Sequence, residues 1–218
     1  MKSQDTTIRI AGAKDARELL EIYRPYVERT AITFEYRVPS PEEFARRIEE
    51  TLKGYPYVAA EREGRIVGYA YGGPFHRRAA YGWAAETSIY VAWDQRKTGV
   101  GRRLHDVLEA ALKAQGILNM NACVACPRQG DDEYVTRNSL EFHRYLGYRL
   151  VGEFVQCGYK FGRWFNMAWL EKHIGDHVTE PAVPRGFSEI RDRFEEELGL
   201  CPGIKNRGLQ GNMESTGI

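Results

Sequence analysis

The chain has 218 residues, of which 43% are hydrophobic and 28% charged, which suits one α/β domain with an appendage. A formal net charge of +1 argues against a general nucleic-acid binder, which would carry a large basic excess. No apolar run reaches membrane-spanning length, and the first residues lack the apolar core of a signal peptide. We therefore expect a cytoplasmic protein that uses neither a membrane nor nucleic acid.

Alternating apolar residues at 6–12 predict a first strand, and two amphipathic helices follow it. Asp15 and Glu18 fit a capping box at the start of the first helix. The second helix begins after Ser40, with proline at its first position. Residues 56–73 then form two strand patterns that turn at Glu63-Gly64, which predicts a hairpin.

The second half continues with a β-branched strand at 85–93, a helix at about 101–115 and a strand at 117–126. A short helix at 138–147 follows, for which Asn138 and Glu141 suggest another capping box. A long hairpin turning near Gly162 closes the pattern. The predicted order is therefore β α α β β β α β α β β.

The composition shifts after Gly175, where a proline-punctuated linker leads to a modest amphipathic helix and a polar end. We accordingly divide the chain into a domain at residues 1–175 and a tail at residues 176–218. The tail could extend a dimer interface or cover a pocket.

The chain has four cysteines, of which Cys123 and Cys126 form a CxxC pair within a predicted strand. No second cysteine or histidine pair stands at zinc-site distance, and residues three apart on a strand point to opposite faces. We expect buried free thiols and no metal. The other two cysteines are Cys157 and Cys201.

A basic, glycine-punctuated turn joins the fourth predicted strand to the next helix, with Arg96, Lys97, Gly99, Gly101 and Arg102. Glycines let a backbone approach a ligand closely, and the free amides of a helix start attract anions. A pyrophosphate suits such a turn, and a flexible solvated turn is the alternative. The sequence has neither a Walker loop nor a dinucleotide-binding fingerprint.

The run Arg96-x-x-Gly99-x-Gly101 resembles the acetyl-CoA pyrophosphate loop of the GNAT acetyltransferases, whose element order matches the predicted one. Further stretches resemble the phosphinothricin and methionine-sulfone acetyltransferase branch: TFE (33–35), YAYGGPF (69–75), AAETSIYV (84–91), SLEFHRYLGY (139–148) and GYKFGRWFNM (158–167). The resemblance covers roughly residues 7–172. It implies an α/β (α+β) GNAT fold, with a mixed, mostly antiparallel sheet of about seven strands flanked by about four helices.

The resemblance implies acetyl-CoA as co-substrate. Main-chain groups of Ile89, Tyr90 and Val91 would bind its pantetheine arm. The pyrophosphate would be held by the amides of Lys97, Thr98, Gly99, Val100, Gly101 and Arg102, which leaves the side chains at 97, 98 and 100 free to vary. The family usually has an asparagine where this chain has Thr136, so Asn138 is a less direct match for that CoA contact.

Acetyl transfer to an amine requires a base, because amines are mostly protonated at neutral pH. Glu86 stands where the branch carries its proposed catalytic glutamate, on a strand that is otherwise β-branched and apolar. A solvated or arginine-paired carboxylate is the alternative. His143 replaces the thiolate-protonating tyrosine of many GNAT enzymes and could act as an acid, join a relay with Glu86 or merely pack. Tyr145 and Tyr159 are weaker candidates for proton delivery or sulfur contact, Tyr145 among the residues that bind the cofactor and Tyr159 among those that bind the acceptor.

The resemblance also places Phe34, Arg78 and Tyr81 at the acceptor, where an arginine would suit a substrate carboxylate. Arg37 stands where the herbicide-resistance enzymes have an acidic residue, so phosphinothricin itself is not assigned. We expect direct acetylation of a small amino-acid-like acceptor, without a cysteine nucleophile. Acetylation of a protein N-terminus or lysine and a non-catalytic CoA-binding module are the alternatives. A homodimer is expected by resemblance.

Overall fold

The computed structural model describes residues 6–127, 130, 132–197 and 199. Cys201, the first five residues and the end of the predicted tail lie outside the described residues. Within the described part of the chain, no helix is both long and apolar enough to cross a membrane.

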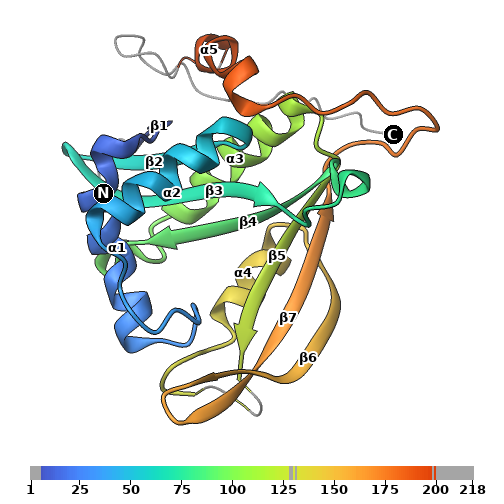
Figure 1. The fold of residues 1–218 in the computed structure, drawn as a ribbon. Helices are drawn as coiled ribbons and strands as arrows, with labels where there is room; N and C mark the ends of the chain where they lie inside the picture. Colours follow the sequence, from blue (N-terminus) through green and yellow to red (C-terminus); the bar gives the residue numbers. More distant parts are fainter. Residues whose placement is uncertain (1–5, 128–129, 131, 198, 200–218) are drawn as a thin grey trace, which may run out of the picture.

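The core is one sheet of seven strands in the order β1-β2-β3-β4-β5-β7-β6, as Figure 1 shows. Every neighbouring pair is antiparallel except β4 and β5, which run parallel. This confirms the predicted GNAT fold. The strands are β1 (Thr7–Ile10), β2 (Tyr57–Arg62), β3 (Arg65–Pro74), β4 (Ala84–Val91), β5 (Asn119–Cys126), β6 (Arg149–Lys160) and β7 (Arg163–His173).

Helices cover both faces of the sheet, and each face has its own apolar cluster. Helices α1 (Ala16–Arg29) and α2 (Pro41–Gly54) bury tyrosine-rich strand residues on one face. Helix α3 (Val100–Gln115) buries the aliphatic residues of the other face. Short 3-10 turns, η1 (Ala13–Asp15), η2 (Ala79–Tyr81) and η3 (Trp93–Gln95), precede α1, β4 and α3.

Two further helices complete the fold. Helix α4 (Asn138–Tyr145) lies against the start of α3, where a Cβ on Gly101 would come within 3.1 Å of the Phe142 ring. Helix α5 (Phe187–Glu197) packs on α2 and α3 and buries Phe187 completely in the α3-side cluster. The tail helix that the sequence predicted is thus part of the apolar core.

Two of the predicted capping boxes are wrong, although α1 begins directly after Asp15 and α4 begins at Asn138. The Asp15 carboxylate binds Arg9 at 2.7 Å and the Gly12 amide at 2.8 Å, so it caps the turn before α1. The carboxylate of Glu18 accepts instead from the Ile66 amide of β3 at 2.7 Å. Helix α4 has Arg137, not Asn138, at its N-cap position. The predicted start of α2 is confirmed, since the Ser40 hydroxyl accepts from the Glu43 amide at 3.1 Å.

Strands β4 and β5 separate soon after they meet. They pair only through Ala84–Asn119, Ala85–Met120 and Glu86–Asn121. Beyond Glu86, β4 stays with β3, whereas β5 stays with β7, and Figure 1 shows the two strands diverging. The resulting opening exposes main-chain groups of β4 that a flat sheet would pair with a neighbour.

Candidate active site

Glu86 lies at the point where β4 and β5 separate. Its side chain shares a face of β4 with Ser88 and Tyr90, as the sequence predicted, because Tyr90 packs in the α1–α2 cluster. Thr87 points to the other face, where it is buried. The carboxylate is therefore partly buried at the apex of the opening, with aromatic side chains along the same face.

Burial raises the pKa of the Glu86 carboxyl, and the positive charge of protonated His76 opposes this shift. Desolvation of the charged form is the physical cause, because the tyrosine-rich face offers little water. Burial likewise raises the pKa of Tyr71, whose hydroxyl lies near Ser88 and Glu86. A carboxyl with a raised pKa binds a proton more readily, which suits a general base.

The basic turn before α3 has the geometry of an anion site. Lys97 and Gly99 adopt left-handed conformations, with φ of 61° and 86°, and nothing lies within 4 Å of an added Cβ on Gly99. The first bond of α3 runs from the Arg103 amide to the Gly99 carbonyl at 3.2 Å. The amides of Val100, Gly101 and Arg102 precede it, and helix starts of this kind bind anions.

Arg62 of β2 braces this turn, a contact that the sequence analysis missed. Its guanidinium donates to the Thr98 hydroxyl at 3.1 Å, the Thr98 carbonyl at 3.2 Å and the Gln95 side chain at 3.0 Å. The expectation that side chains at 98 and 100 vary freely is wrong, because Thr98 is tied to Arg62 and Val100 is fully buried in the core. No sequence motif indicates the role of Arg62, because the β2–β3 hairpin brings it to the basic turn only in the folded chain.

The outward main-chain groups of β4 lie between Glu86 and the basic turn. Hydrogen bonds alternate along an antiparallel pair, and Ala92 donates to Val67 of β3 at 2.9 Å. Tyr90 therefore pairs toward β3, whereas Ile89 and Val91 face the opening. The Tyr26 hydroxyl of α1 bonds both groups of Val91, donating to its carbonyl at 2.6 Å and accepting from its amide at 3.3 Å.

His143 lies on the other face of β4 from Glu86. It is buried, its Nδ1 lies 2.7 Å from the Ser139 carbonyl oxygen, and burial lowers its pKa. Its ring meets the Tyr148 ring edge-on at a centroid distance of 5.1 Å. The Tyr148 hydroxyl in turn lies 3.5 Å from the Thr87 hydroxyl. His143 thus belongs to a polar group under the strand that carries Glu86.

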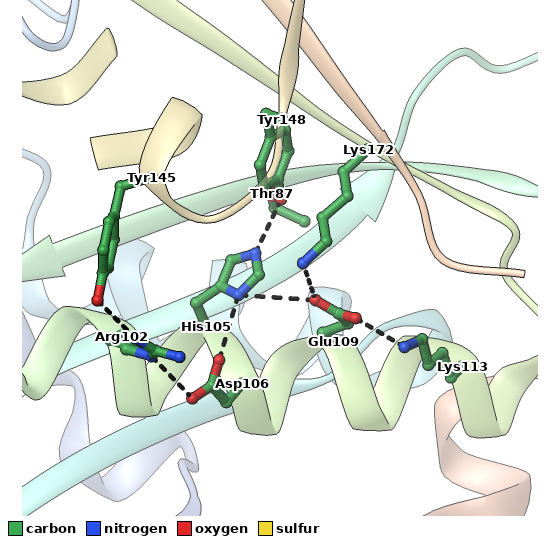
Figure 2. Close-up of polar contacts among 9 residues, drawn as sticks. All are labelled: Thr87, Arg102, His105, Asp106, Glu109, Lys113, Tyr145, Tyr148 and Lys172. Atoms are coloured by element: carbon green, nitrogen blue, oxygen red, sulfur yellow. Dashed lines mark hydrogen bonds and ion pairs between the residues drawn. The ribbon is translucent and has the colours of Figure 1, made fainter. Parts of the chain in front are cut away.

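Figure 2 shows the deeper part of this polar group, which centres on His105 of α3. Its Nε2 lies 3.2 Å from the Tyr148 hydroxyl, and burial lowers its pKa to about 4. Its Nδ1 lies 3.8 Å from carboxylate oxygens of Asp106 and Glu109 and has no hydrogen-bond partner among the described residues. Lys172 of β7 holds Glu109 at 2.6 Å, so the group joins α3 to β7.

Tyr145 and Asn138 lie on α4, near the basic turn. The Tyr145 hydroxyl accepts from Arg102 at 2.5 Å (Figure 2), and the residue is 68% exposed. Asn138 is exposed and lies one turn before Phe142, the residue that contacts Gly101. Tyr145 therefore lies beside the start of α3.

A comparison with known protein families identifies the family of this chain. The model of the acetyltransferase (GNAT) domain family matches residues 8–169. The chain belongs to the GNAT acetyltransferases.

Its relatives narrow the branch. The acetyltransferase is 30% identical over 178 residues to phosphinothricin N-acetyltransferase of Streptomyces viridochromogenes, covering 82% of this chain and 91% of that protein. It is 32% identical to L-methionine sulfoximine/L-methionine sulfone acetyltransferase of Pseudomonas aeruginosa, covering 80% and 98%. A solved phosphinothricin acetyltransferase of Sinorhizobium meliloti, in complex with AcCoA, superposes with a TM-score of 0.74 at 35% identity, covering 81% and 93%.

The predicted acceptor residues of this acetyltransferase come from three segments. Phe34, on the loop after α1, packs on Gly158 of β6, where an added Cβ would lie 2.0 Å from its ring. The Lys160 ammonium donates to the carbonyls of Thr30 at 2.8 Å and Thr33 at 2.7 Å, which fixes this loop. Burial lowers the pKa of Lys160 to about 8. Sequence patterns missed Lys160, because its partners are main-chain groups.

The other predicted acceptor residues are more exposed. Arg78 lies in solvent at the start of η2, and Tyr81 is 40% exposed at its end, with its ring 5.8 Å from that of Phe75. Tyr159 of β6 is 47% exposed, and its ring lies 5.0 Å from that of Trp164. Tyr81 therefore packs with Phe75 and His76, whereas Arg78 would need to turn inward to reach a ligand.

The described cysteines of the acetyltransferase are free thiols, but they are not equally buried. Cys126 is buried, Cys123 is half-buried and Cys157 is exposed. Burial raises the pKa of Cys123 to about 12, and the neighbouring charge of Glu86 acts in the same direction. A thiol of this kind stays protonated and is a poor nucleophile. Among the described residues, no group of three or more His, Cys, Asp or Glu could hold a metal ion.

Proposed function

We propose that this N-acetyltransferase transfers the acetyl group of acetyl-CoA directly to the α-amino group of a small amino-acid-like acceptor. The main support is the position of Glu86, a partly buried carboxylate at the apex of the β4–β5 opening. The named substrates of its relatives, phosphinothricin and oxidised methionine analogues, are all α-amino acids.

The residues around the opening fit acetyl-CoA as the co-substrate. The amides at the start of α3 and the side chains of Lys97 and Arg102 would hold the pyrophosphate. The outward main-chain groups of Ile89 and Val91 would bind the pantetheine arm, and Val91 would exchange its Tyr26 contact for it. Asn138 and Tyr145 would border the same region from α4. Acetyl-CoA supplies an activated acyl group, and the protein binds and orients it.

In this proposal Glu86 accepts a proton from the acceptor's ammonium group, directly or through one water molecule. An amine attacks only in its neutral form, so a base with a raised pKa increases the reactive fraction. The proton needed by the departing thiolate would come from His143 or from the amine itself. His143 is buried with a lowered pKa and lies under β4, so we assign it to positioning or proton supply rather than to the base role.

The test is a thiol-release assay with acetyl-CoA and a panel of acceptors. The panel contains the proteinogenic amino acids, methionine sulfone, methionine sulfoximine, phosphinothricin and several peptides with free N-termini or lysines. We expect turnover on free amino acids only. Turnover on peptides alone would support protein acetylation instead, and tight acetyl-CoA binding without turnover on any acceptor would support a binding module.

We further propose that two copies of the chain pair through β6. This strand forms one edge of the sheet, and edge strands offer unpaired main-chain groups to a partner. Its exposed apolar side chains include Val151, Phe154 and Val155, which are 54%, 58% and 69% exposed. We expect a dimer mass in light scattering and a monomer for Val155→Lys. A monomeric wild type would contradict this proposal without affecting the catalytic one.

A further inference from the structure

A cavity of about 400 Å³ lies beside Glu86, on the same face of the sheet. Ala84 and Asn121 line it, and Glu86 follows Ala84 by two residues and pairs with Asn121. Two residues of strand span roughly 7 Å, which is about the reach of a long amino-acid side chain. An acceptor whose amino group contacts Glu86 could therefore extend its side chain into this cavity.

The wall of the cavity offers mainly apolar surface. Phe75, Tyr81 and Trp83 supply aromatic rings from the loop before β4, and Leu118 supplies an aliphatic side chain. The polar lining groups already have partners. His177 bonds the Asn119 side chain at 2.7 Å, and the side chains of Asn121 and Glu171 bond the Ala85 carbonyl and Arg149.

No lysine or arginine is among the described residues that line the cavity, and Glu171 contributes a carboxylate. A side chain with its own negative charge, such as a carboxylate or a phosphinate, would find no cation there. Burying an unpaired charge is costly, whereas an apolar group gains from leaving water. The cavity therefore favours an uncharged, apolar side chain.

One side of the cavity comes from residues 176–186, which we call the C-terminal strap. The strap lies beyond residue 169, where the family match ends, and Figure 1 shows it leading from β7 to α5. His177, Val178 and Pro181 of the strap line the cavity. The Trp83 indole donates to the Ala182 carbonyl at 2.8 Å, so the strap is tied to the opposite wall.

We propose that this cavity receives the side chain of a bulky apolar or aromatic α-amino acid acceptor, and that the C-terminal strap sets this preference. The inference rests on the proposed acetylation of α-amino acids and adds the class of side chain. It makes the strap a specificity element that lies beyond the residues matched by the family model.

The first experiment compares kcat/KM for phenylalanine and alanine in Val178→Trp, which narrows the cavity from the strap. Val178 is 59% exposed, so the larger side chain does not disturb the core. We expect kcat/KM for phenylalanine to fall roughly tenfold and that for alanine to change less than about twofold, as expected for steric loss in an apolar pocket. Val183→Trp, at a 79% exposed strap position that does not line the cavity, is the matched control.

An equal loss for both acceptors, or no loss for either, would overturn the inference. If the wild-type enzyme acetylates no amino acid, the proposed function fails, and a binding measurement still tests the cavity. In protein labelled with 5-fluorotryptophan, phenylalanine should shift the ¹⁹F resonance of Trp83 and leave that of Trp93, on another part of the surface, unchanged. An unchanged Trp83 resonance would overturn the cavity assignment as well.

Discussion

Glu86 is a carboxylate in an aromatic environment, and its protonation state decides whether it can accept a proton. Burial raises its pKa, and the charge of protonated His76 lowers it. Burial favours the protonated carboxyl of Glu86, whereas the charge of His76 favours the ionised carboxylate. A change of pH and a substitution of His76 can therefore separate the two effects. The same face also holds Tyr71 and Ser88, which leaves the carboxylate little water.

The pH dependence of kcat/KM should report the ionisation of Glu86. Between the pKa of Glu86 and that of the acceptor amine, kcat/KM should change little, because the ionised carboxylate takes the proton of the bound ammonium group. Below the pKa of Glu86, kcat/KM should fall tenfold per pH unit. His76→Gln removes a charge that favours the carboxylate, so this fall should begin at a higher pH. A tenfold fall that begins at the pKa of the amine would mean that only the free neutral amine reacts and that Glu86 takes no proton from it.

His105 provides a second test at the residue scale, in the pH dependence of stability. Its pKa falls from 6.5 to about 4 on burial, so the unfolded chain binds more protons between these values. The free energy of unfolding should therefore decrease as the pH drops from 6.5 to 4, by up to about 3 kcal/mol. Urea denaturation at several pH values should show a shallower decrease for His105→Gln.

At the scale of elements, the strand–turn–helix unit from β4 to α3 carries the anion site. The turn depends on Gly99 and Lys97 for its left-handed residues and on Arg62 for its anchorage. Because Arg62 contacts the turn and not the ligand, it acts as a positioning residue. Its contribution should appear in cofactor binding rather than in the chemical step.

Arg62→Met should raise the KM for acetyl-CoA roughly tenfold, because it removes hydrogen bonds from a charged donor that hold the turn. The kcat should change little. Arg62→Lys should restore part of the binding, and Arg65→Met, an exposed arginine on the same hairpin, should behave as wild type. A fall in kcat with an unchanged KM would contradict the positioning role.

Local patterns predicted the elements well, because they depend on neighbouring residues. The alternation in β4, the serine and proline before α2 and the positive-φ turns at Glu63-Gly64 and near Gly162 all have local causes. The capping boxes predicted at Asp15 and Asn138 were wrong. The Asp15 carboxylate binds Arg9 of β1, a contact that no spacing rule indicates, and α4 has Arg137 at its N-cap position.

The site could be predicted only in part for the same reason. The basic turn and the face of Glu86 follow from the sequence, and the resemblance supplied the candidate roles. Arg62, Tyr26 and Lys160 contact the site region through main-chain groups or through partners more than 30 positions away. Such contacts form only when the sheet is packed, so no periodic pattern in the sequence indicates them.

At the scale of the whole molecule, the C-terminal part of the described chain is integrated with the fold. Phe187 is completely buried, and Ile190 and Phe194 of α5 belong to the same apolar cluster. Gln115 of α3 donates to the Arg185 carbonyl at 2.8 Å and so fixes the strap. A strap held at both ends can present its cavity-lining residues in one conformation.

Phe187→Ala should lower the free energy of unfolding by about 3–5 kcal/mol, because it leaves a cavity in the core. Val183→Ala, at a 79% exposed position of the strap, should be close to neutral. Chemical denaturation measures both. A similarly small change in the free energy of unfolding for both variants would mean that α5 does not pack in the apolar core.

The most direct test of the catalytic account is the kcat of Glu86→Gln, measured together with the Kd for acetyl-CoA. Glutamine keeps the shape of the side chain and cannot accept the proton. If Glu86 is the base, kcat should fall about 10²–10⁴-fold with an unchanged Kd. A kcat within about twofold of wild type, on an acceptor that wild type acetylates, would contradict the assignment of Glu86.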